Sequence, residues 1–446
     1  MQRSLEGVSV LVAGAGLAGL AAAHELTAAG ATLTVVDARD RVGGRVWTIR
    51  DGFADGQHAE AGGDLIEEQH HAIRELAGQL DLKLRRILRN GWGYIRADRS
   101  GRSTMVRPSA ASGWRRLSGA IDTVSKPYRL AEGRWDTPIA ADLARRSAAA
   151  WLDETHADAE LRATVTGLRS FFLADPDDLS LIALVDQFAA DTPGSNAQYR
   201  IEGGNQRLAT ALAQPLGDRV LLNAEVVAIS QRGHKVRVSV KAGRRLSQVA
   251  CDYAILTLPA AVLRRIPVTP ALPAPQHEAI ARLRYGGATR TLLQFNRRFW
   301  RAGGRPRAFG SALPIGAVWD GNEEQRGRSG ILSFLAGGGA SDATQGLTAK
   351  VGPRGLLDSL GWPGARDAEL LASRQIVWEH DPFARGGYAF FDPSFDPSLR
   401  AWLARPCGRL FFAGEHTSIK WQGYMNGAVE SGRRAAFEVV ATHGHL

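Results

Sequence analysis

The sequence predicts an α/β protein in which a parallel sheet is joined to a second domain of mixed helices and strands. Residues 8–37 follow the order of a parallel strand–helix–strand unit. Residues 117–190 are dense in charge and poor in glycine, with apolar residues at helical spacing, which predicts an inserted helical lobe. With 446 residues, 44% of them hydrophobic, the chain is long enough to bury the cores of two domains.

The first strand and helix are marked by a change in the period of the apolar residues. Residues 8–12 form a short run with β-branched side chains, typical of a buried parallel strand. An alanine- and leucine-rich helix then ends at Gly30, and a second strand over 32–36 leads directly into Asp37. This is the unit of Rossmann-type dinucleotide-binding domains.

The turn between strand and helix carries a complete G-x-G-x-x-G motif, formed by Gly14, Gly16 and Gly19. Gly14 allows the tight turn, Gly16 lets a pyrophosphate approach the backbone, and Gly19 lets the helix pack closely on the strand. The helix N-terminus offers N–H groups to the phosphates. Asp37 is placed to accept hydrogen bonds from a ribose hydroxyl, and its charge disfavours the 2′-phosphate of NADP.

A second glycine loop follows this acid and distinguishes NAD from FAD. The adjacent Gly43 and Gly44 are flanked by Arg39 and Arg45, which gives close backbone approach together with cations for a diphosphate. A single nicotinamide site needs no such second loop. With this run the sequence resembles the FAD-dependent amine oxidases, the monoamine and polyamine oxidases and their relatives. The same D-x-R-x-G-G-R run occurs in carotenoid desaturases and protoporphyrinogen oxidases, so it implies FAD without fixing the reaction.

The resemblance covers essentially the whole chain and implies further cofactor contacts. Gly62 and Gly63 fall in the family's acidic-x-G-G segment beside the flavin, and Val226 matches the position whose backbone holds the adenine. The run LFFAGEHTSIKWQGYMNGAVESGRR at 410–434 predicts a strand, a loop and a helix starting near Gly423. In the family this helix points its N-terminus at the pyrimidine ring of the flavin. The residues that the resemblance assigns to the cofactor here are Gly414, Glu415, Tyr424 and Met425.

The resemblance also places the substrate pocket. Tyr424 matches one wall of the family's aromatic cage, where a ring face attracts and orients the amine nitrogen. Counting from the glycine pair at 386–387, the opposite wall falls on Ala389, with Phe390 or Trp421 as its replacement. The expected pocket residues are Phe171, Phe172, Ala389, Phe390 and Trp421.

Two positions depart from the family pattern. The family's lysine, which holds a water against flavin N5, falls on Arg290. Arginine stays charged and is a planar fork, so three roles are open: holding the water, binding a substrate carboxylate, or facing solvent or a local acid. Tyr388 falls where monoamine oxidases carry the cysteine that attaches FAD, and neither Cys251 nor Cys407 is at that position. FAD is therefore expected to be bound non-covalently. The resemblance implies Arg290 and Tyr424 as the catalytic residues.

Composition limits the partners and the compartment. The chain has 55 basic and 45 acidic residues, a formal net charge of +10, but its arginines are scattered in pairs, so we expect no nucleic-acid partner. Two cysteines are too few for a disulfide framework, and no signal sequence or bilayer-spanning run is found. The sequence thus predicts a cytoplasmic protein with no membrane partner and no metal site.

The remaining elements complete a two-domain arrangement. A helix is expected over 70–82, a hairpin over 92–101, and strands over 219–229, 236–240, 250–258 and 285–300. We expect a discontinuous FAD-binding domain of residues 1–82, 199–284 and 401–446, and a substrate-binding domain of residues 83–198 and 285–400 with a mixed sheet and the helical lobe.

The resemblance implies oxidation of an amine by transfer of a hydride equivalent to flavin N5. The imine then hydrolyses, so the expected partners are a small amine and O2, which gives H2O2, or another electron acceptor. Two alternatives stay open: a flavoenzyme of the same build that acts on a C–C bond, such as a desaturase, and a non-catalytic flavoprotein that serves as a binding module. A homodimer is left open, because the sequence does not decide the oligomeric state.

Overall fold

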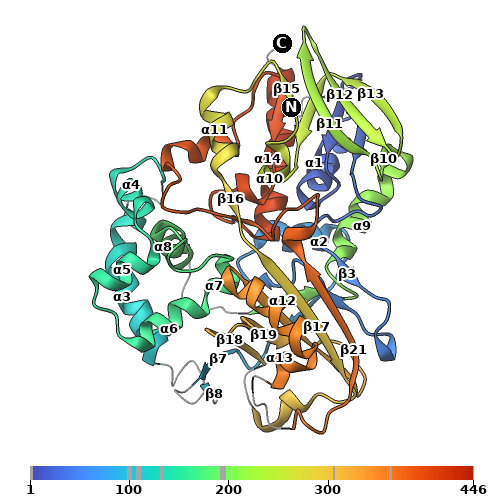
Figure 1. Ribbon diagram of the computed structural model, residues 1–446. Coiled ribbons are helices and arrows are strands. Elements are labelled where there is room, and N and C mark those ends of the chain that lie inside the picture. The colour runs from blue at the N-terminus through green and yellow to red at the C-terminus, as the bar shows by residue number, and fades with distance from the viewer. Residues whose placement is uncertain are drawn as a thin grey trace.

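A parallel sheet carries the nucleotide-binding motif in the computed structural model of the chain (Figure 1). The structure describes residues 4–97, 103–106, 112–130, 134–190, 197–304, 307–358, 360 and 364–444. The strands of this sheet are β1 (Ser9–Ala13), β2 (Thr32–Val36), β10 (Val220–Leu221), β14 (Tyr253–Leu256) and β23 (Leu410–Phe412). Their order is β10-β2-β1-β14-β23, and every neighbouring pair is parallel. The parallel unit predicted from residues 8–37 is confirmed.

Two helices from opposite ends of the chain pack side by side on this sheet. They are α1 (Leu17–Ala28) and α14 (Met425–His443), blue and red in Figure 1. A Cβ at Gly432 would lie 2.1 Å from the carbonyl oxygen of Ala18, so only glycine allows the two helices to approach this closely. The contact fixes the C-terminal motif beside the N-terminal one.

A second sheet departs from the expected strand pattern. Its strands are β11 (Glu225–Arg232), β12 (Lys235–Ala242), β13 (Arg245–Cys251) and β15 (Val268–Thr269). The single strand expected over 250–258 is wrong, because β13 ends in this sheet while β14 begins in the parallel one. Asp252 lies at the break between the two strands. Its carboxylate accepts two hydrogen bonds from Ser9, one from the backbone N–H at 2.9 Å and one from the side-chain hydroxyl at 2.7 Å.

A seven-stranded mixed sheet forms the other half of the molecule. Its strands are β7 (Trp92–Ala97), β8 (Ser103–Val106), β17 (Ala288–Phe295), β18 (Ala308–Ser311), β19 (Ala317–Asp320), β20 (Gly330–Gly337) and β21 (Leu370–Val377). Their order is β21-β17-β20-β19-β18-β7-β8, with only β18 and β7 parallel. β7 and β8 pair antiparallel, as the hairpin expected over 92–101 requires, and the predicted turn at Ser100 and Gly101 lies outside the described residues. Helices α12 (Gly339–Val351) and α13 (Arg354–Asp358) lie beside this sheet, and every residue of β17 is buried.

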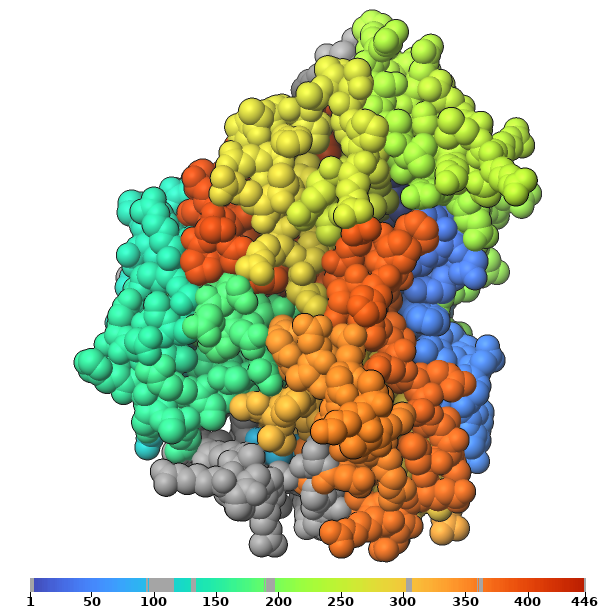
Figure 2. Space-filling model, in the orientation of Figure 1, coloured from blue at the N-terminus to red at the C-terminus, as the bar shows by residue number. Residues whose placement is uncertain are grey.

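The predicted helical lobe is present and projects to one side of the molecule. Its helices are α3 (Ser112–Leu130), α4 (Pro138–Arg145), α5 (Ala148–Glu154), α6 (Ala159–Gly167), α7 (Arg169–Phe172) and α8 (Leu181–Ala190). On the face shown in Figure 2, the lobe (teal to green) and the region of α12 and α13 (orange) lie on opposite sides. The expected fold class, with a Rossmann-type domain, a mixed sheet and a lobe, is confirmed.

Shorter elements connect these parts. The helices are α2 (His71–Gln79), α9 (Gln206–Ala213), α10 (Ala260–Leu263) and α11 (Ala274–Arg282). The strands are β3 (Thr48–Ile49), β4 (Ala59–Glu60), β5 (Ile66–Glu67), β6 (Leu84–Ile87), β9 (Gln198–Ile201), β16 (Arg284–Tyr285) and β22 (Ala389–Phe390). They pair as β3 with β4, β16 with β22, and β5-β9-β6, and in the last sheet residues 84–87 join residues 198–201.

Candidate active site

A cavity of about 1440 Å³ is lined by residues of the parallel sheet, the mixed sheet and the lobe. This volume exceeds the roughly 300–1,000 Å³ of a pocket for one small ligand, so it has room for a large cofactor and a substrate together. The predicted cofactor residues that line it are Gly14, Gly16, Asp37, Arg39, Gly43, Gly44, Arg45, Gly62, Gly63, Val226, Gly414, Glu415, Tyr424 and Met425. The predicted pocket residues Phe171, Phe172, Ala389, Phe390 and Trp421 line it too, as does Arg290.

The glycines of the first loop expose bare backbone to this cavity. Gly14 has a φ of +111°, which favours glycine, and a Cβ there would lie 2.5 Å from Thr257 Oγ1. A Cβ at Gly16 would meet no protein atom within 4 Å, so its absence leaves open space in the cavity. Gly19 is not among the lining residues. A Cβ there would lie 1.9 Å from the carbonyl oxygen of Gly14, so only glycine allows the helix to pack this closely on the turn. The three positions thus differ in the way that a pyrophosphate turn requires.

The N-terminus of α1 faces the same cavity without a side-chain cap. Its N-cap is Gly16, which has no side chain to bond the first-turn N–H groups, and the first turn contains no acidic residue. Donors and the positive end of the helix dipole therefore meet in one place, which is the chemistry that binds a diphosphate.

Asp37 holds the two glycine loops together. Its Oδ2 accepts a hydrogen bond from the backbone N–H of Ala15 at 2.8 Å, and its Oδ1 accepts one from that of Arg39 at 2.9 Å. The Gly43 N–H donates to the Ala15 carbonyl at 2.8 Å, so the loops are also bonded directly. Burial raises the pKa of the Asp37 carboxyl. A carboxylate oxygen accepts more than one hydrogen bond, so the contact with a ribose hydroxyl expected of Asp37 is compatible with these bonds.

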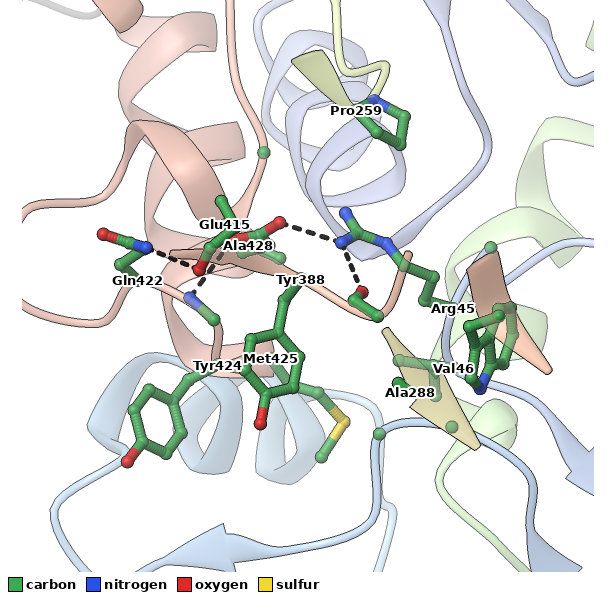
Figure 3. Close-up of a pocket in the computed structure, with 18 of the residues that line it drawn as sticks. Arg45, Val46, Pro259, Ala288, Tyr388, Glu415, Gln422, Tyr424, Met425 and Ala428 are labelled. Carbon is green, nitrogen blue, oxygen red and sulfur yellow. Dashed lines mark hydrogen bonds and ion pairs between the residues drawn. The ribbon is translucent and has the colours of Figure 1, made fainter. Parts of the chain in front are cut away.

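Arg45 and Glu415 clamp three segments around the cavity (Figure 3). Arg45 Nη1 donates to Glu415 Oε1 at 2.8 Å and to the carbonyl oxygen of Gly387 at 2.8 Å. Glu415 Oε2 accepts from the Gly423 N–H at 3.1 Å, just before α14 begins. Burial alone would lower the pKa of Arg45, but Glu415, Tyr285 and Asp381 together outweigh it and raise that pKa. The guanidinium therefore stays charged inside the protein.

Tyr424 lies at the start of α14 and is held on three sides. Its hydroxyl donates to Gln187 Oε1 in the lobe at 2.8 Å. Its ring makes a T-shaped contact with His70 at 4.9 Å and one with Trp421 at 5.9 Å between ring centroids. Burial lowers the pKa of His70 to about 3, so this imidazole is neutral. These contacts leave the Tyr424 ring few orientations.

Tyr388 provides a second tyrosine in the cavity wall (Figure 3). Its hydroxyl donates to the Phe171 carbonyl at 2.5 Å, and its ring carbon Cδ2 lies 3.1 Å from where a Cβ at Gly423 would be. The residue expected in this role, Ala389, has a side chain too small to form an aromatic wall and is 3% exposed. Ala389 lines the cavity together with its predicted replacements Phe390 and Trp421, and Tyr388 adds a ring that counting from the glycine pair did not assign to the substrate pocket.

Arg290 is buried in the cavity wall and does not face solvent. It is 4% exposed, its Nη1 donates to Ser333 Oγ at 2.9 Å, and its Nη2 donates to the Gly62 carbonyl at 2.9 Å. Its guanidinium carbon lies 4.6 Å from the ring centroid of Trp319. A local acid is also near, since Asp64 Oδ2 lies 3.8 Å from Nη1. Burial lowers the pKa of Arg290, yet an arginine remains a cation at neutral pH.

A charged network behind the Gly62–Gly63 segment escaped the sequence reasoning. Asp64 accepts hydrogen bonds from Arg200 Nε and from Trp319 Nε1, each at 2.7 Å, and Arg200 Nη1 pairs with Glu324 Oε2 at 2.6 Å. Burial raises the pKa of the neighbouring Glu60 to about 8. These residues come from three distant segments, 60–64, 200 and 319–324, so no sequence spacing marks them as a group.

Comparison with known proteins decides the family. The model of the flavin-containing amine oxidoreductases matches residues 17–440. The chain belongs to this family. AofH of Mycobacterium tuberculosis, which is named as a flavin-containing monoamine oxidase, is 31% identical over 97% of each chain. An L-amino-acid oxidase from Pseudechis australis is 26% identical over 98% of this chain and 88% of its own.

Solved structures agree with this family assignment. The cyclohexylamine oxidase from Brevibacterium oxydans IH-35A is 25% identical, with a TM-score of 0.87 over 98% of this chain and 99% of its own. Wild-type putrescine oxidase bound to putrescine is 26% identical, with a TM-score of 0.84 over 97% of this chain and 99% of its own. The chain is therefore an FAD-dependent oxidoreductase of the amine oxidase class, as the sequence predicted.

The residues of the cavity fit FAD. The space at Gly16, the uncapped start of α1 and the cations of the second loop have the chemistry for a pyrophosphate. The first N–H groups of α14 receive no side-chain cap from Tyr424, so this positive end of the helix can stabilise the electron-rich edge of a flavin ring. In the described part of the chain, no three His, Cys, Asp or Glu side chains are grouped to hold a metal ion, and no helix has the length and apolar character to cross a bilayer.

Proposed function

We propose that this chain oxidises a small amine at the carbon bonded to nitrogen and that the imine product then hydrolyses. The observation that carries the proposal is the presence of Tyr388 and Tyr424 in the same cavity as the flavin motifs. When bound, FAD supplies at N5 the acceptor for the hydride equivalent that leaves the C–H bond. The protein's part is to orient that bond and to keep the amine neutral.

The two tyrosines would orient the amine through their ring faces. An aromatic face attracts an amine nitrogen or a cation, and it does so best when its position is fixed. The hydroxyl bonds of Tyr388 to Phe171 and of Tyr424 to Gln187 fix both rings from the lobe side. A C–C desaturase would have no use for such a nitrogen-binding pair.

Arg290 would favour the neutral amine and hold a water. A fixed cation in the cavity wall lowers the pKa of a bound ammonium, and the neutral form has the lone pair that the oxidation requires. Nη1 and Nη2 of Arg290 each use one of their two N–H groups, on Ser333 and on Gly62, so the fork that would bind a substrate carboxylate is partly occupied. The Nε–H has no partner among the described residues, which leaves one buried donor for a water.

The cofactor would lie across the cavity along the predicted residues. The start of α1 with Gly16, and the loop with Gly43, Gly44 and Arg45, would hold the diphosphate. Asp37 would bind the ribose and the Val226 backbone the adenine. The start of α14 would stabilise negative charge on the pyrimidine side of the reduced ring.

Anaerobic mixing tests this function. FAD-loaded protein is mixed with a panel of primary amines, secondary amines and amino acids, and loss of the oxidised flavin absorbance is followed. Bleaching by amines supports the proposal, and the amine panel defines its class. If none of them bleaches the flavin while the protein still binds FAD, the result would favour a binding module. Conversion of a C–C single bond of a substrate to a double bond would favour a desaturase.

We further propose that O2 reoxidises the cofactor and yields H2O2. Admitting air after bleaching should restore the absorbance and give one peroxide per turnover. Restoration only by an added artificial acceptor would make the enzyme a dehydrogenase.

A further inference from the structure

Asp186 places a carboxylate in a part of the cavity wall that carries no other charge. This residue belongs to α8 of the lobe and lines the cavity next to Gln187, the partner of Tyr424. Among the described residues, every other lobe side chain in that wall is uncharged, and most are apolar, such as Leu168, Phe172 and Ala183. A lone carboxylate on an apolar wall is costly to bury unless it has a partner.

The protein satisfies this carboxylate only in part. Asp186 Oδ1 accepts a hydrogen bond from the Tyr128 hydroxyl at 2.8 Å. Among the described residues, no donor bonds Oδ2 and no basic side chain forms an ion pair with Asp186. One oxygen of a half-buried carboxylate is therefore left for something in the cavity.

The cation that acts on the Asp186 charge, Arg400, is already bonded elsewhere. Arg400 donates through Nη1 to the His416 carbonyl at 2.7 Å and through Nη2 to the Ser418 carbonyl. Its guanidinium carbon also lies 4.8 Å from the ring centroid of Phe391. Its charge favours the ionised form of Asp186 at a distance, without supplying a donor. Burial raises the pKa of Asp186 to about 6, so the carboxylate is ionised at neutral pH.

We infer that Asp186 binds a second positively charged group of the substrate, so that the natural substrate is an amine with a distal ammonium or guanidinium. The inference rests on the proposed amine oxidation and narrows its substrate class. The cavity then has opposite charges with separate tasks. Arg290, which is bonded to Gly62, disfavours a positive charge on the amine that reacts. Asp186, which is bonded to Tyr128 within the lobe, favours a positive charge at the far end of the substrate.

The test compares paired substrates in the FAD-loaded enzyme. Diaminohexane and hexylamine are similar in length and differ in the distal charge. In Asp186→Asn the amide oxygen can still accept from Tyr128, so the shape of the wall is kept while the charge is lost. We expect the ratio of kcat/KM for diaminohexane to that for hexylamine to fall about tenfold or more. Tyr128→Phe is the matched control, because it removes the hydrogen bond and keeps the carboxylate.

Binding without turnover gives a second readout. Calorimetry on the chemically reduced enzyme under anaerobic conditions should show diaminohexane binding weakened about tenfold in Asp186→Asn and retained in Tyr128→Phe. An unchanged ratio and unchanged binding in Asp186→Asn would overturn the inference, as would equal losses in both variants. Failure of the enzyme to oxidise any amine would overturn the proposed function instead, and the calorimetry would still decide the role of Asp186.

Discussion

The hydroxyl of Tyr424 donates a hydrogen bond to Gln187 Oε1 at 2.8 Å, joining residues 237 positions apart in the chain. Tyr424 precedes α14, which packs on the nucleotide-binding sheet, while Gln187 belongs to α8 of the lobe. The lobe therefore sets the orientation of a residue in the C-terminal flavin motif.

Tyr424→Ala should slow flavin reduction roughly tenfold, which is about 1.4 kcal/mol, because one orienting ring face is lost. The measurement is the rate of anaerobic bleaching with a good amine substrate. FAD content should stay that of the wild type. Tyr424→Phe keeps the ring and loses only the bond to Gln187, so its rate should fall less. Equal rates in all three proteins would remove Tyr424 from the site.

The sequence predicts this tyrosine but not its partner, and the reason is physical. Tyr424 lies in a local motif whose strand, loop and helix are contiguous. Gln187 lies in an apolar helix where no spacing sets it apart, and only tertiary packing brings the two together. The same holds for Asp64, Arg200 and Glu324, whose network needs three distant segments.

FAD should be released from the purified protein by heat or acid. The two cysteines, Cys251 and Cys407, are absent from the cavity wall, and the motif position of the attaching cysteine holds Tyr388. The supernatant after acid precipitation should contain one FAD per chain and the pellet should be colourless. Yellow colour that stays with the denatured chain would contradict this.

Glu415→Gln should weaken FAD binding, because it removes the charge that keeps Arg45 paired beside the start of α14. Loss of one partner of a largely buried pair costs about 3–5 kcal/mol, part of which appears as lower stability. Both the dissociation constant of FAD and the melting temperature should be measured. Glu438→Gln, which breaks an ion pair with Arg434 within α14, serves as a control with a small effect.

Stability should fall steeply in mild acid because two buried histidines stay neutral in the fold. Burial lowers the pKa of His70 to about 3 and that of His416 to about 4, from 6.5. Below pH 6.5 the unfolded chain binds these protons and the folded one does not. Each histidine should therefore lower the free energy of unfolding by about 1.4 kcal/mol per pH unit, until its folded pKa is reached. Urea unfolding between pH 7 and about 4 measures this slope.

His70→Gln separates this effect from general acid unfolding. Its side-chain oxygen can accept the bond that His70 Nδ1 now accepts from the Glu67 N–H at 3.0 Å. In this variant the slope of unfolding free energy against pH should be smaller by about 1.4 kcal/mol per pH unit, the contribution of one proton. His277→Gln, at an exposed position of α11, should leave the slope unchanged. A slope equal to that of the wild type in His70→Gln would show that His70 does not titrate in this way.

The family's lysine position shows where motif counting succeeds and where it stops. Counting back from Trp300 places a cation on β17, and Arg290 is indeed buried in the cavity wall. Counting cannot tell which of its N–H groups are already used, because Ser333 and Gly62 come from distant segments. That distinction separates a water-holding role from a carboxylate-binding one.

Arg290→Met tests these two roles directly. If Arg290 holds a water, flavin reduction or reoxidation should change about tenfold or more for every substrate alike. If instead it binds a carboxylate, KM should rise steeply for an amino acid and stay nearly constant for the decarboxylated amine, since such a charge-assisted pair contributes about 1.5–3 kcal/mol. We expect the first result, because Nη1 and Nη2 are each held by a bond to the protein while the buried Nε–H has no partner among the described residues. Arg290→Lys keeps the charge beside Asp64 and should recover part of the loss. Rates unaltered in both half-reactions of Arg290→Met would assign the residue to structure alone.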